Sequence, residues 1–200
     1  MTLKIAETSV PIHELIATRW SPRAFTSEPV SLPQQAALVE AARWAPSSYN
    51  LQPWRFLLWD RHRHPEAFAK VLATLSGTNR AWATGAPLLI GVYADSRGVD
   101  GQKNHAAAYD TGAAAISLAL QAQALGLHAH QLGGFDREAL RSAFTIPNEW
   151  SPQALIAVGR QGDPALLRDD LRARELAPRV RRPLAEIAFA DGPDQPLPPV

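Results

Sequence analysis

The sequence contains no cysteine. This excludes disulfide bonds, zinc–thiolate sites, iron–sulfur clusters and thiol nucleophiles together. The six histidines show no metal-ligand motif, because the members of the pairs His62/His64 and His128/His130 lie only two residues apart. We therefore expect no bound metal. A chain without thiols fits a reducing compartment, and we expect the protein to be cytoplasmic.

An excess of either charge is also lacking, since twenty basic side chains face nineteen acidic ones and the formal net charge is +1. The net charge is too small to attract a nucleic acid or an anionic membrane, so any anion-binding site must be formed by a local group of basic residues. The first thirty residues lack the apolar core and cleavage site of a signal peptide. The longest apolar stretch, 106–127, is interrupted by Asp110, Gln121 and Gln123, which favours a buried helix over a membrane span.

The chain has no internal repeat and, apart from its proline-rich end, no low-complexity tract. Two hundred residues that are 46% hydrophobic can bury roughly 70% of the surface that the unfolded chain exposes. We expect a single domain over 1–200, with its core from about residue 12 to 189. Residues 190–200 would extend across a surface or a partner.

The first half of the chain predicts two helices and a strand. Residues 12–18 place apolar side chains on one side of a short helix. Ser31 and Gln34 have the spacing of a capping box, with Pro33 in the first turn of a helix that Pro46 ends. Residues 54–59 are typical of a strand.

The second half alternates predicted helices and strands. We expect helices at 66–75, at 104–125 and from the N-cap Asp136 to about residue 144, with a weaker one at 165–175. We expect strands at 87–93, 127–132 and 154–158, and a turn at 77–79. Gly126 suits the left-handed residue after the long helix. Because helical segments separate the strands, the fold class is α/β or α+β, with one central sheet flanked by helices.

Residues 19–23, Arg-Trp-Ser-Pro-Arg, place two guanidinium groups and a hydroxyl together at the end of a helix. Such a group can hold a phosphate through charge-assisted hydrogen bonds. Taken alone, it is more typical of a solvated helix end whose arginines interact with the helix dipole. Arg179, Arg181 and the adjacent Arg182 form a second basic group, which alone indicates a solvated charged tail.

Residues 46–53, Pro-Ser-Ser-Tyr-Asn-Leu-Gln-Pro, combine hydroxyls and carboxamides between two prolines. Carboxamides offer both hydrogen-bond polarities, which suits the edge of a flat heterocycle, although composition alone favours an ordinary surface loop. Trp54, which follows, is expected in the core.

Three further features have alternative interpretations. Gly133 and Gly134 follow a strand and can expose backbone N–H groups to a ligand, but the dinucleotide-binding pattern G-x-G-x-x-G is missing. His128 and His130 share one strand face, which we interpret as polar. The long helix has an edge of small residues that fits either a neighbouring helix or a second subunit: Ala107, Ala108, Thr111, Ala114 and Ala115.

In combination, the order R-W-S-P-R, P-S-S-Y-N-L-Q-P-W, N-R-A-W-A-T-G-A-P-L-L-I, D-T-G-A-A, A-L-G-L and G-G-F-D resembles the nitroreductase family of FMN-dependent oxidoreductases. The resemblance runs from about residue 12 to 189, and P-S-S-x-N-x-Q-P-W is its most specific part. It implies a nitroreductase-like fold with a central mixed sheet, and a homodimer with the long central helix at the interface.

The resemblance also implies the residues that bind FMN. Arg19, Ser21 and Arg23, with the backbone at Trp20, would hold the phosphate and ribityl chain together with Arg179 and Arg181. Pro46, Ser47, Ser48 and Asn50, with Gln52 nearby, would reach the flavin from the other subunit. Asn79 would contact the flavin, and Gly133 and Gly134 would present main-chain N–H groups to its N5. Tyr49, Leu51, Trp82 and residues 93–103 are candidates to line the open face.

The implied activity is hydride transfer from NADH or NADPH, through bound FMN, to nitroaromatic, quinone or similar planar acceptors. No side chain is needed as a catalytic nucleophile, because the chemistry takes place at flavin N5. The alternatives are a flavin-binding or flavin-sequestering module with little turnover, and a relative that fragments reduced flavin or removes halogen reductively.

Overall fold

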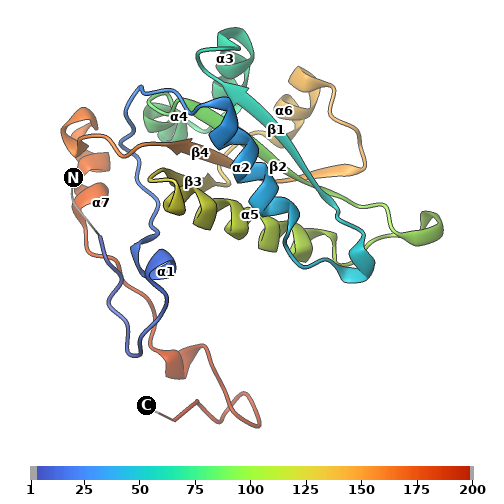
Figure 1. Cartoon of the computed structure of the whole chain (residues 1–200), viewed down its shortest axis with the longest axis vertical. Helices are drawn as coiled ribbons and strands as arrows, with labels where there is room; N and C mark the ends of the chain where they lie inside the picture. Colours follow the sequence, from blue (N-terminus) through green and yellow to red (C-terminus); the bar gives the residue numbers. More distant parts are fainter. Residues whose placement is uncertain (1–3, 199–200) are drawn as a thin grey trace.

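The computed structural model describes residues 4–198. It contains one four-stranded sheet with helices on both faces (Figure 1), which confirms the α+β class predicted from the sequence. The strands are β1 (Trp54–Asp60), β2 (Leu88–Asp95), β3 (His128–Leu132) and β4 (Trp150–Gly159), in the order β1-β2-β4-β3. The two central strands, β2 and β4, make the longest pairing, from Leu88 opposite Val158 to Asp95 opposite Trp150.

The sheet was expected to be mixed, but all three strand pairings within the described residues are antiparallel. The complete burial of β2 comes from cover on both of its faces, and burial of that kind does not require parallel neighbours. Because hydrophobic runs report burial and carry no information on strand direction, the sequence could not settle this point.

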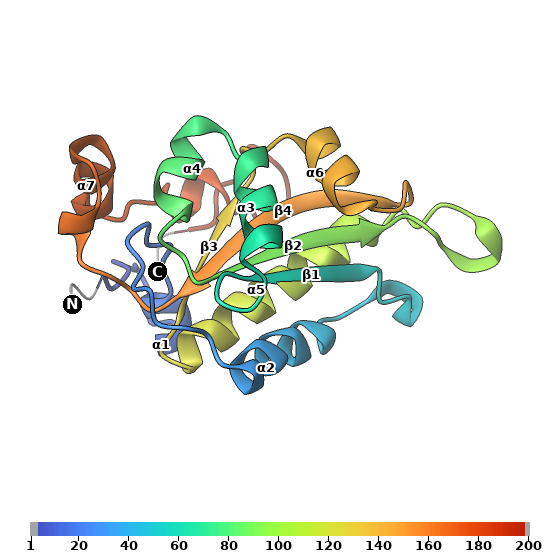
Figure 2. The same ribbon diagram turned by 90° about the horizontal axis from the view of Figure 1, so that it is seen from above.

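Different helices cover the two faces of the sheet (Figure 2). On one face lie α2 (Leu32–Arg43) and the long α5 (Ala107–Ala124), whose Leu38 and Leu118 pack with Ile156 of β4. On the other lie α3 (Pro65–Thr74), α4 (Gly77–Ala83) and α6 (Arg137–Phe144), whose core includes Phe68 and Trp82.

Local sequence signals account for several helix ends. The predicted capping box is present at α2, where the Gln34 N–H donates to Ser31 Oγ at 3.3 Å and the Ser31 N–H donates to Gln34 Oε1 at 3.0 Å. Asp136 caps α6 by accepting a hydrogen bond from the Ala139 N–H at 2.9 Å. Each such cap stabilises the structure by about 1 kcal/mol. Gly126 follows α5 with φ of +69°, as expected.

Three expected elements differ from those observed. The turn expected at 77–79 is the start of α4, because the buried Trp82 and Ala83 continue the segment as a helix. The strand expected at 154–158 is longer and begins at Trp150. The weak helix expected at 165–175 is divided into η3 (Pro164–Leu166) and α7 (Asp169–Leu176).

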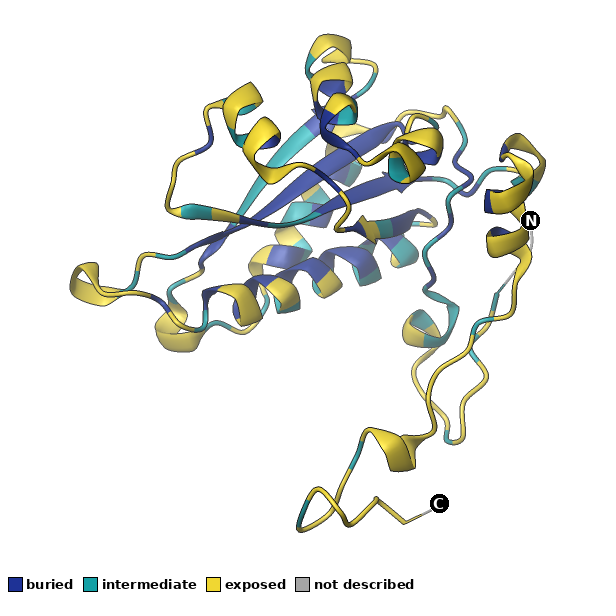
Figure 3. Cartoon of the chain, turned by 180° about the vertical axis from the view of Figure 1, so that it is seen from behind, coloured by how far each residue is buried: buried dark blue, intermediate teal, exposed yellow. Residues whose placement is uncertain are grey.

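The N-terminal segment and the segment that follows α7 run side by side beyond one end of the sheet, close to α1 (Glu14–Thr18) (Figure 1). After α7 the chain leaves the body and extends past α1, with one short turn, η4 (Leu184–Glu186). Among the described residues beyond 176, almost all are exposed (Figure 3). Within residues 4–198, no helix is both long and apolar enough to cross a bilayer.

Candidate functional site

The two basic groups from opposite ends of the sequence meet in the structure. Arg179 donates to the carbonyl oxygens of Ala17 at 2.7 Å and Arg19 at 2.9 Å. The half-buried Arg19 directs Nη1 to Ser21 Oγ at 3.3 Å. The residues Arg19 and Arg179, predicted to bind phosphate from two distant parts of the sequence, are thus adjacent, where the segment after α7 passes the end of α1 (Figure 1).

Arg19, Arg179 and Arg181 form a cluster of positive charge. Burial lowers the pKa of Arg19 below its usual value, and the charges of Arg179 and Arg181 lower it further. The pKa of Arg179 is lowered by burial and then by Arg181. Within the described residues none of the three forms an ion pair with a carboxylate. A partly buried cluster of guanidinium groups of this kind is chemically suited to a phosphate.

Arg23, also expected at the phosphate, is held by Glu175 of α7. The buried Glu175 carboxylate accepts hydrogen bonds from the backbone N–H of Arg23 at 2.9 Å and of Ala24 at 3.3 Å, and lies 3.8 Å from Arg23 Nη1. Lys4 adds a hydrogen bond to the Ala177 carbonyl oxygen at 2.6 Å and lies over the Trp20 ring. Trp20 itself is buried. Glu175 therefore joins both ends of the chain and fixes the segment that carries Arg19.

The polar loop at 46–52 is anchored to α5 and contains η1 (Ser48–Asn50). The buried Asp110 carboxylate accepts a hydrogen bond from the Ser48 N–H at 2.9 Å and contacts Ser47 Oγ at 3.2 Å. Ser47 Oγ in turn accepts from the Gln52 N–H at 2.8 Å, and Gln52 Nε2 donates to the Asn50 carbonyl oxygen at 3.1 Å. One carboxylate thus organises the whole loop.

The same loop has a strained backbone that turns its side chains outward. Tyr49, Asn50 and Gln52 have φ values of 51°, 53° and 48°, the left-handed region that non-glycine residues adopt rarely. The side chains of Pro46, Ser48, Asn50 and Gln52 are exposed. A loop held in this conformation leaves its polar groups accessible at the surface of the chain.

The third predicted group, Asn79, Gly133 and Gly134, also comes together. Asn79 Nδ2 donates to the Gly134 carbonyl oxygen at 3.1 Å, which joins α4 to the turn after β3. A Cβ atom at Gly134 would lie 2.7 Å from Asn79 Nδ2, so a side chain at this position would displace the Asn79 carboxamide from its present place. Gly133 is exposed and has open space where a side chain would be. This turn can therefore be reached by a ligand at backbone level.

Of the three predicted groups of flavin-binding residues, only two lie near each other within one chain. The arginine cluster and the Asn79–Gly134 contact both border β3, whose His128 lies against Trp20 with ring centroids 6.3 Å apart. The loop at 46–52 instead lies at the opposite end of α5 (Figure 1). An α-helix of 18 residues is about 27 Å long. A single chain thus brings together the first and third groups and keeps the second apart from them.

The face of β3 that carries His128 and His130 was expected to be polar, and this is wrong. His130 stacks on Trp82 with ring centroids 4.4 Å apart, and its Nδ1 lies 2.9 Å from the Pro22 carbonyl oxygen. Burial lowers the pKa of His130 to about 4 and lowers that of His128 as well. Alternation along a strand indicates which residues share a face, and tertiary packing decides what covers it.

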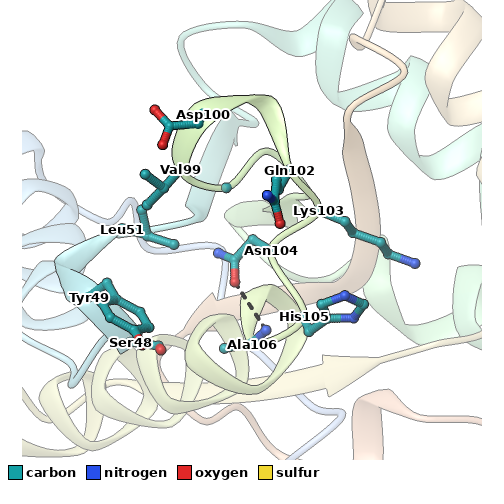
Figure 4. A pocket seen from close by; sticks show the side chains of 11 residues that line it. Ser48, Tyr49, Leu51, Val99, Asp100, Gln102, Lys103, Asn104, His105 and Ala106 are labelled. Carbon is teal, nitrogen blue, oxygen red and sulfur yellow. Dashed lines mark hydrogen bonds between the residues drawn. The ribbon is translucent and has the colours of Figure 1, made fainter.

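A hollow of about 420 Å³ lies between the polar loop and residues 98–106 (Figure 4). Among the residues that the sequence suggests for the open face, the hollow is lined by Tyr49, Leu51, residues 98–100, which include part of η2 (Val99–Gly101), and residues 102–103. Their place beside a flavin stays a prediction. Two other candidates for that lining, Trp82 and Tyr93, are buried in the core, at 2% and 0% exposure. Large aromatic side chains on buried elements supply core volume, and the sequence offered no signal to separate the two roles.

Sequence reasoning missed three residues that shape these groups: Asp110, Asn104 and Glu175. Asp110 gave the clearest signal, because a charge inside an apolar helix requires a partner when it is buried. Asn104 and Glu175 lie in polar segments, where nothing in the sequence distinguishes a buried polar side chain from a solvated one.

Comparisons with known proteins add independent findings. The model of the family described as the nitroreductase family matches residues 16–76 and 60–160. An uncharacterised protein of Mycolicibacterium smegmatis is 37% identical over 126 residues, which cover 63% of this chain and 84% of that protein. A protein of Thermus thermophilus named NADH dehydrogenase is 28% identical over 173 residues, covering 70% of this chain and 82% of that protein.

Solved structures are also similar. One, described as an oxidoreductase containing FMN, has a TM-score of 0.89 and 34% identity, and the match covers 94% of this chain and 96% of that chain. Another, from Desulfovibrio desulfuricans and solved in complex with FMN, has a TM-score of 0.70 and 29% identity, covering 90% and 95% of the two chains.

Proposed function

The chain belongs to the nitroreductase family, and we propose that, as an FMN-dependent NAD(P)H oxidoreductase, it transfers reducing equivalents to nitroaromatic, quinone or similar planar acceptors. The family resemblance seen in the sequence is thereby confirmed. The observation that supports the cofactor within this chain is the convergence of Arg19, Arg179 and Arg181, which share no carboxylate among residues 4–198.

The donor set of this chain fits FMN along the edge of β3. The arginine cluster with Ser21 would hold the phosphate, and Arg181 fits this role better than Arg182, because the charge of Arg181 acts on both Arg19 and Arg179. Arg23 would support the segment from its contact with Glu175. At the far end of β3 the exposed backbone of Gly133 and Gly134, with Asn79, would face the flavin ring.

The remaining predicted contacts require a second copy of the chain, and we infer a homodimer built on α5. The outward side of α5 carries Tyr109, Gly112 and Ile116, and Tyr109 and Ile116 are 83% and 43% exposed. Two such helices packed antiparallel about a two-fold axis would place the 46–52 loop of one chain beside the arginine cluster of the other.

The extended segment after α7 supports the same assembly. Val180, Leu184, Ile187 and Phe189 are exposed by 76%, 41%, 60% and 46%. Apolar side chains in a segment that has left the body of its own chain (Figure 3) gain burial by covering a partner. The protein is proposed to work as two single-domain subunits with two FMN sites, each lined by both chains.

In this arrangement the chemistry belongs to the cofactor and the protein provides binding and position. When bound, FMN supplies hydride acceptance at N5 from NADH or NADPH and, in a second step, electron transfer to an acceptor in the same pocket. Arg19 and Arg179 orient the phosphate end. The Gly133–Gly134 backbone offers N–H groups where negative charge develops on reduction.

Purified protein should be yellow, and anaerobic stopped-flow mixing with NADH or NADPH should bleach its flavin absorbance rapidly. Protein that lacks flavin and whose melting temperature does not respond to FMN would contradict the proposal. Flavin that binds but is not reduced would favour the alternative of a flavin-binding or flavin-sequestering module. Analysis of products would identify a flavin-fragmenting or dehalogenating reaction.

A further inference from the structure

The hollow beside the polar loop has apolar walls and one buried donor. Tyr49, Leu51 and Val99 form its walls, and Tyr49 and Val99 are 90% and 54% exposed. Asn104 lies at its base and is only 7% exposed. A volume of about 420 Å³ is within the range of pockets that bind small molecules, roughly 300–1,000 Å³.

The orientation of the Asn104 carboxamide is fixed by its neighbour in the chain. Asn104 Oδ1 accepts a hydrogen bond from the Ala106 N–H at 3.0 Å, so Nδ2 occupies the opposite side of the amide. Figure 4 shows this nitrogen directed toward the space between Leu51, Val99 and Tyr49. Nδ2 is buried and has no hydrogen-bond partner among the described residues. Leaving a buried donor unpaired is unfavourable, and a ligand acceptor would relieve that cost.

The loop that carries Asn104 is preorganised. The Asn104 N–H donates to the Ser96 carbonyl oxygen at 2.8 Å, and the Gly98 N–H donates to that of Gln102 at 2.7 Å. A Cβ atom at Gly98 would lie 2.9 Å from this Gln102 oxygen, so the tight turn requires glycine. Because backbone hydrogen bonds close the loop, the hollow and its donor are present before any ligand arrives.

We propose that Asn104 Nδ2 donates a hydrogen bond to the carbonyl oxygen of a planar aromatic acceptor, such as a quinone, that lies in the hollow against Leu51 and Tyr49. This inference rests on the proposed function. Ser48 connects the hollow with the proposed flavin site, because it lines the hollow and also belongs to the loop predicted to contact flavin. An acceptor held here would lie beside the place where that loop meets the ring.

The surrounding charges favour a neutral ligand oxygen over an anion. Lys103 and His105 line the hollow, but Figure 4 shows their side chains extending away from the Asn104 nitrogen, and Asp100 points outward at the rim. Ser48 and Gln102 also line the hollow, but Asn104 Nδ2 is its buried donor without a partner among the described residues. Such a site binds a ring with an acceptor oxygen and discriminates against the same ring without it, because the buried donor is then left unpaired.

Two ligands that differ at one atom test the proposal: acetophenone has a carbonyl oxygen where α-methylstyrene has a methylene group. We expect calorimetric titration of the FMN-loaded protein to show tighter binding of acetophenone. Asn104→Asp keeps an oxygen that accepts from the Ala106 N–H and removes the N–H donor. It should weaken the binding of acetophenone about tenfold and leave the affinity for α-methylstyrene unchanged. Asn148→Asp makes the same change at an exposed residue and should alter neither.

Turnover gives a second readout, since Asn104→Asp should raise KM for p-benzoquinone more than it lowers kcat. Equal binding of the two ligands by the unsubstituted protein, or acetophenone binding unchanged by the substitution, would overturn the proposal. If Asn104→Asp does not fold, Asn104→Ser retains an oxygen for Ala106 and should lose the same preference. Flavin content and the rate of flavin reduction by NADH are measured in parallel. Protein without flavin, or with flavin that NADH does not reduce, would contradict the proposed function, whereas normal flavin reduction without the acetophenone preference would contradict only the role of Asn104.

Discussion

The buried carboxylate of Asp110, in the first turn of α5, accepts a hydrogen bond from the backbone N–H of Ser48 at 2.9 Å. This contact fixes a loop whose backbone is otherwise unfavourable, because three of its residues have positive φ. Asp110 touches no predicted ligand and acts through the loop, so it is a positioning residue.

Replacing Asp110 by alanine removes the acceptor for Ser48 and Ser47. We expect the free energy of unfolding of the FMN-free protein to fall by about 1–3 kcal/mol and its affinity for FMN to fall as well. Asp110→Asn retains one acceptor oxygen and should lose less of both. Urea unfolding and FMN titration measure the two effects, with Glu66→Ala, an exposed carboxylate on α3, as control. Unchanged FMN affinity in Asp110→Ala would contradict the positioning role.

Arg19 is expected to recognise the phosphate of FMN. Its side chain makes one hydrogen bond within the described chain, to Ser21, so its removal should disturb the fold little. Arg19→Ala should weaken FMN binding about 10- to 100-fold and leave riboflavin, which lacks the phosphate, unaffected. Fluorescence titration with both flavins provides the measurement, and the exposed Arg182→Ala is the matched control. An equal loss for riboflavin would place Arg19 elsewhere than at the phosphate.

Ile116 is expected to lie in the dimer interface. Ile116→Asp would place a charge on the outward side of α5 and should convert the dimer to a monomer with much weaker FMN binding. Sedimentation velocity and FMN titration would be compared with Ala143→Asp, the same kind of change on the exposed side of α6, across the sheet. A variant that stays dimeric and retains FMN would show that α5 is not the interface.

His130 should make stability depend on pH. Burial lowers the pKa of His130 to about 4 from the ordinary 6.5, so the folded protein holds this residue neutral while the unfolded chain binds a proton below 6.5. Stability should therefore decrease as pH falls from 6.5 to 4, by up to about 3 kcal/mol from this group. His130→Phe keeps a ring against Trp82 and should flatten this dependence in urea unfolding at pH 7 and pH 4.5. If the free energy of unfolding of His130→Phe depends on pH as strongly as that of the unsubstituted protein, other groups cause the dependence.

Much of the fold was accessible from the sequence because short-range signals decide it. The capping residues Ser31 and Asp136 set helix starts, and Gly126 set a helix end. Strand direction was not accessible, since the burial of β2 is compatible with either arrangement. The helix that begins at Gly77 was read as a turn, because the buried Trp82 that stabilises it lies five residues later.

The candidate site was accessible only through the combination of motifs. Residues 19–23 and the group at 179–182 each resemble a solvated helix end or tail, and only folding brings Arg19 and Arg179 together. Asp110 and Asn104 could not be assigned, because their importance depends on burial and on which atom remains unpaired.

The hydrogen bond between Arg179 and the carbonyl oxygen of Arg19 joins residues 160 positions apart. During synthesis Arg19 leaves the ribosome long before Arg179, so the cradle proposed for the phosphate cannot close until the chain has emerged as far as Arg179. A nascent chain that has not yet reached Arg179 therefore lacks part of the donor set proposed for FMN, and one long-range contact separates a folded sheet from a complete phosphate site.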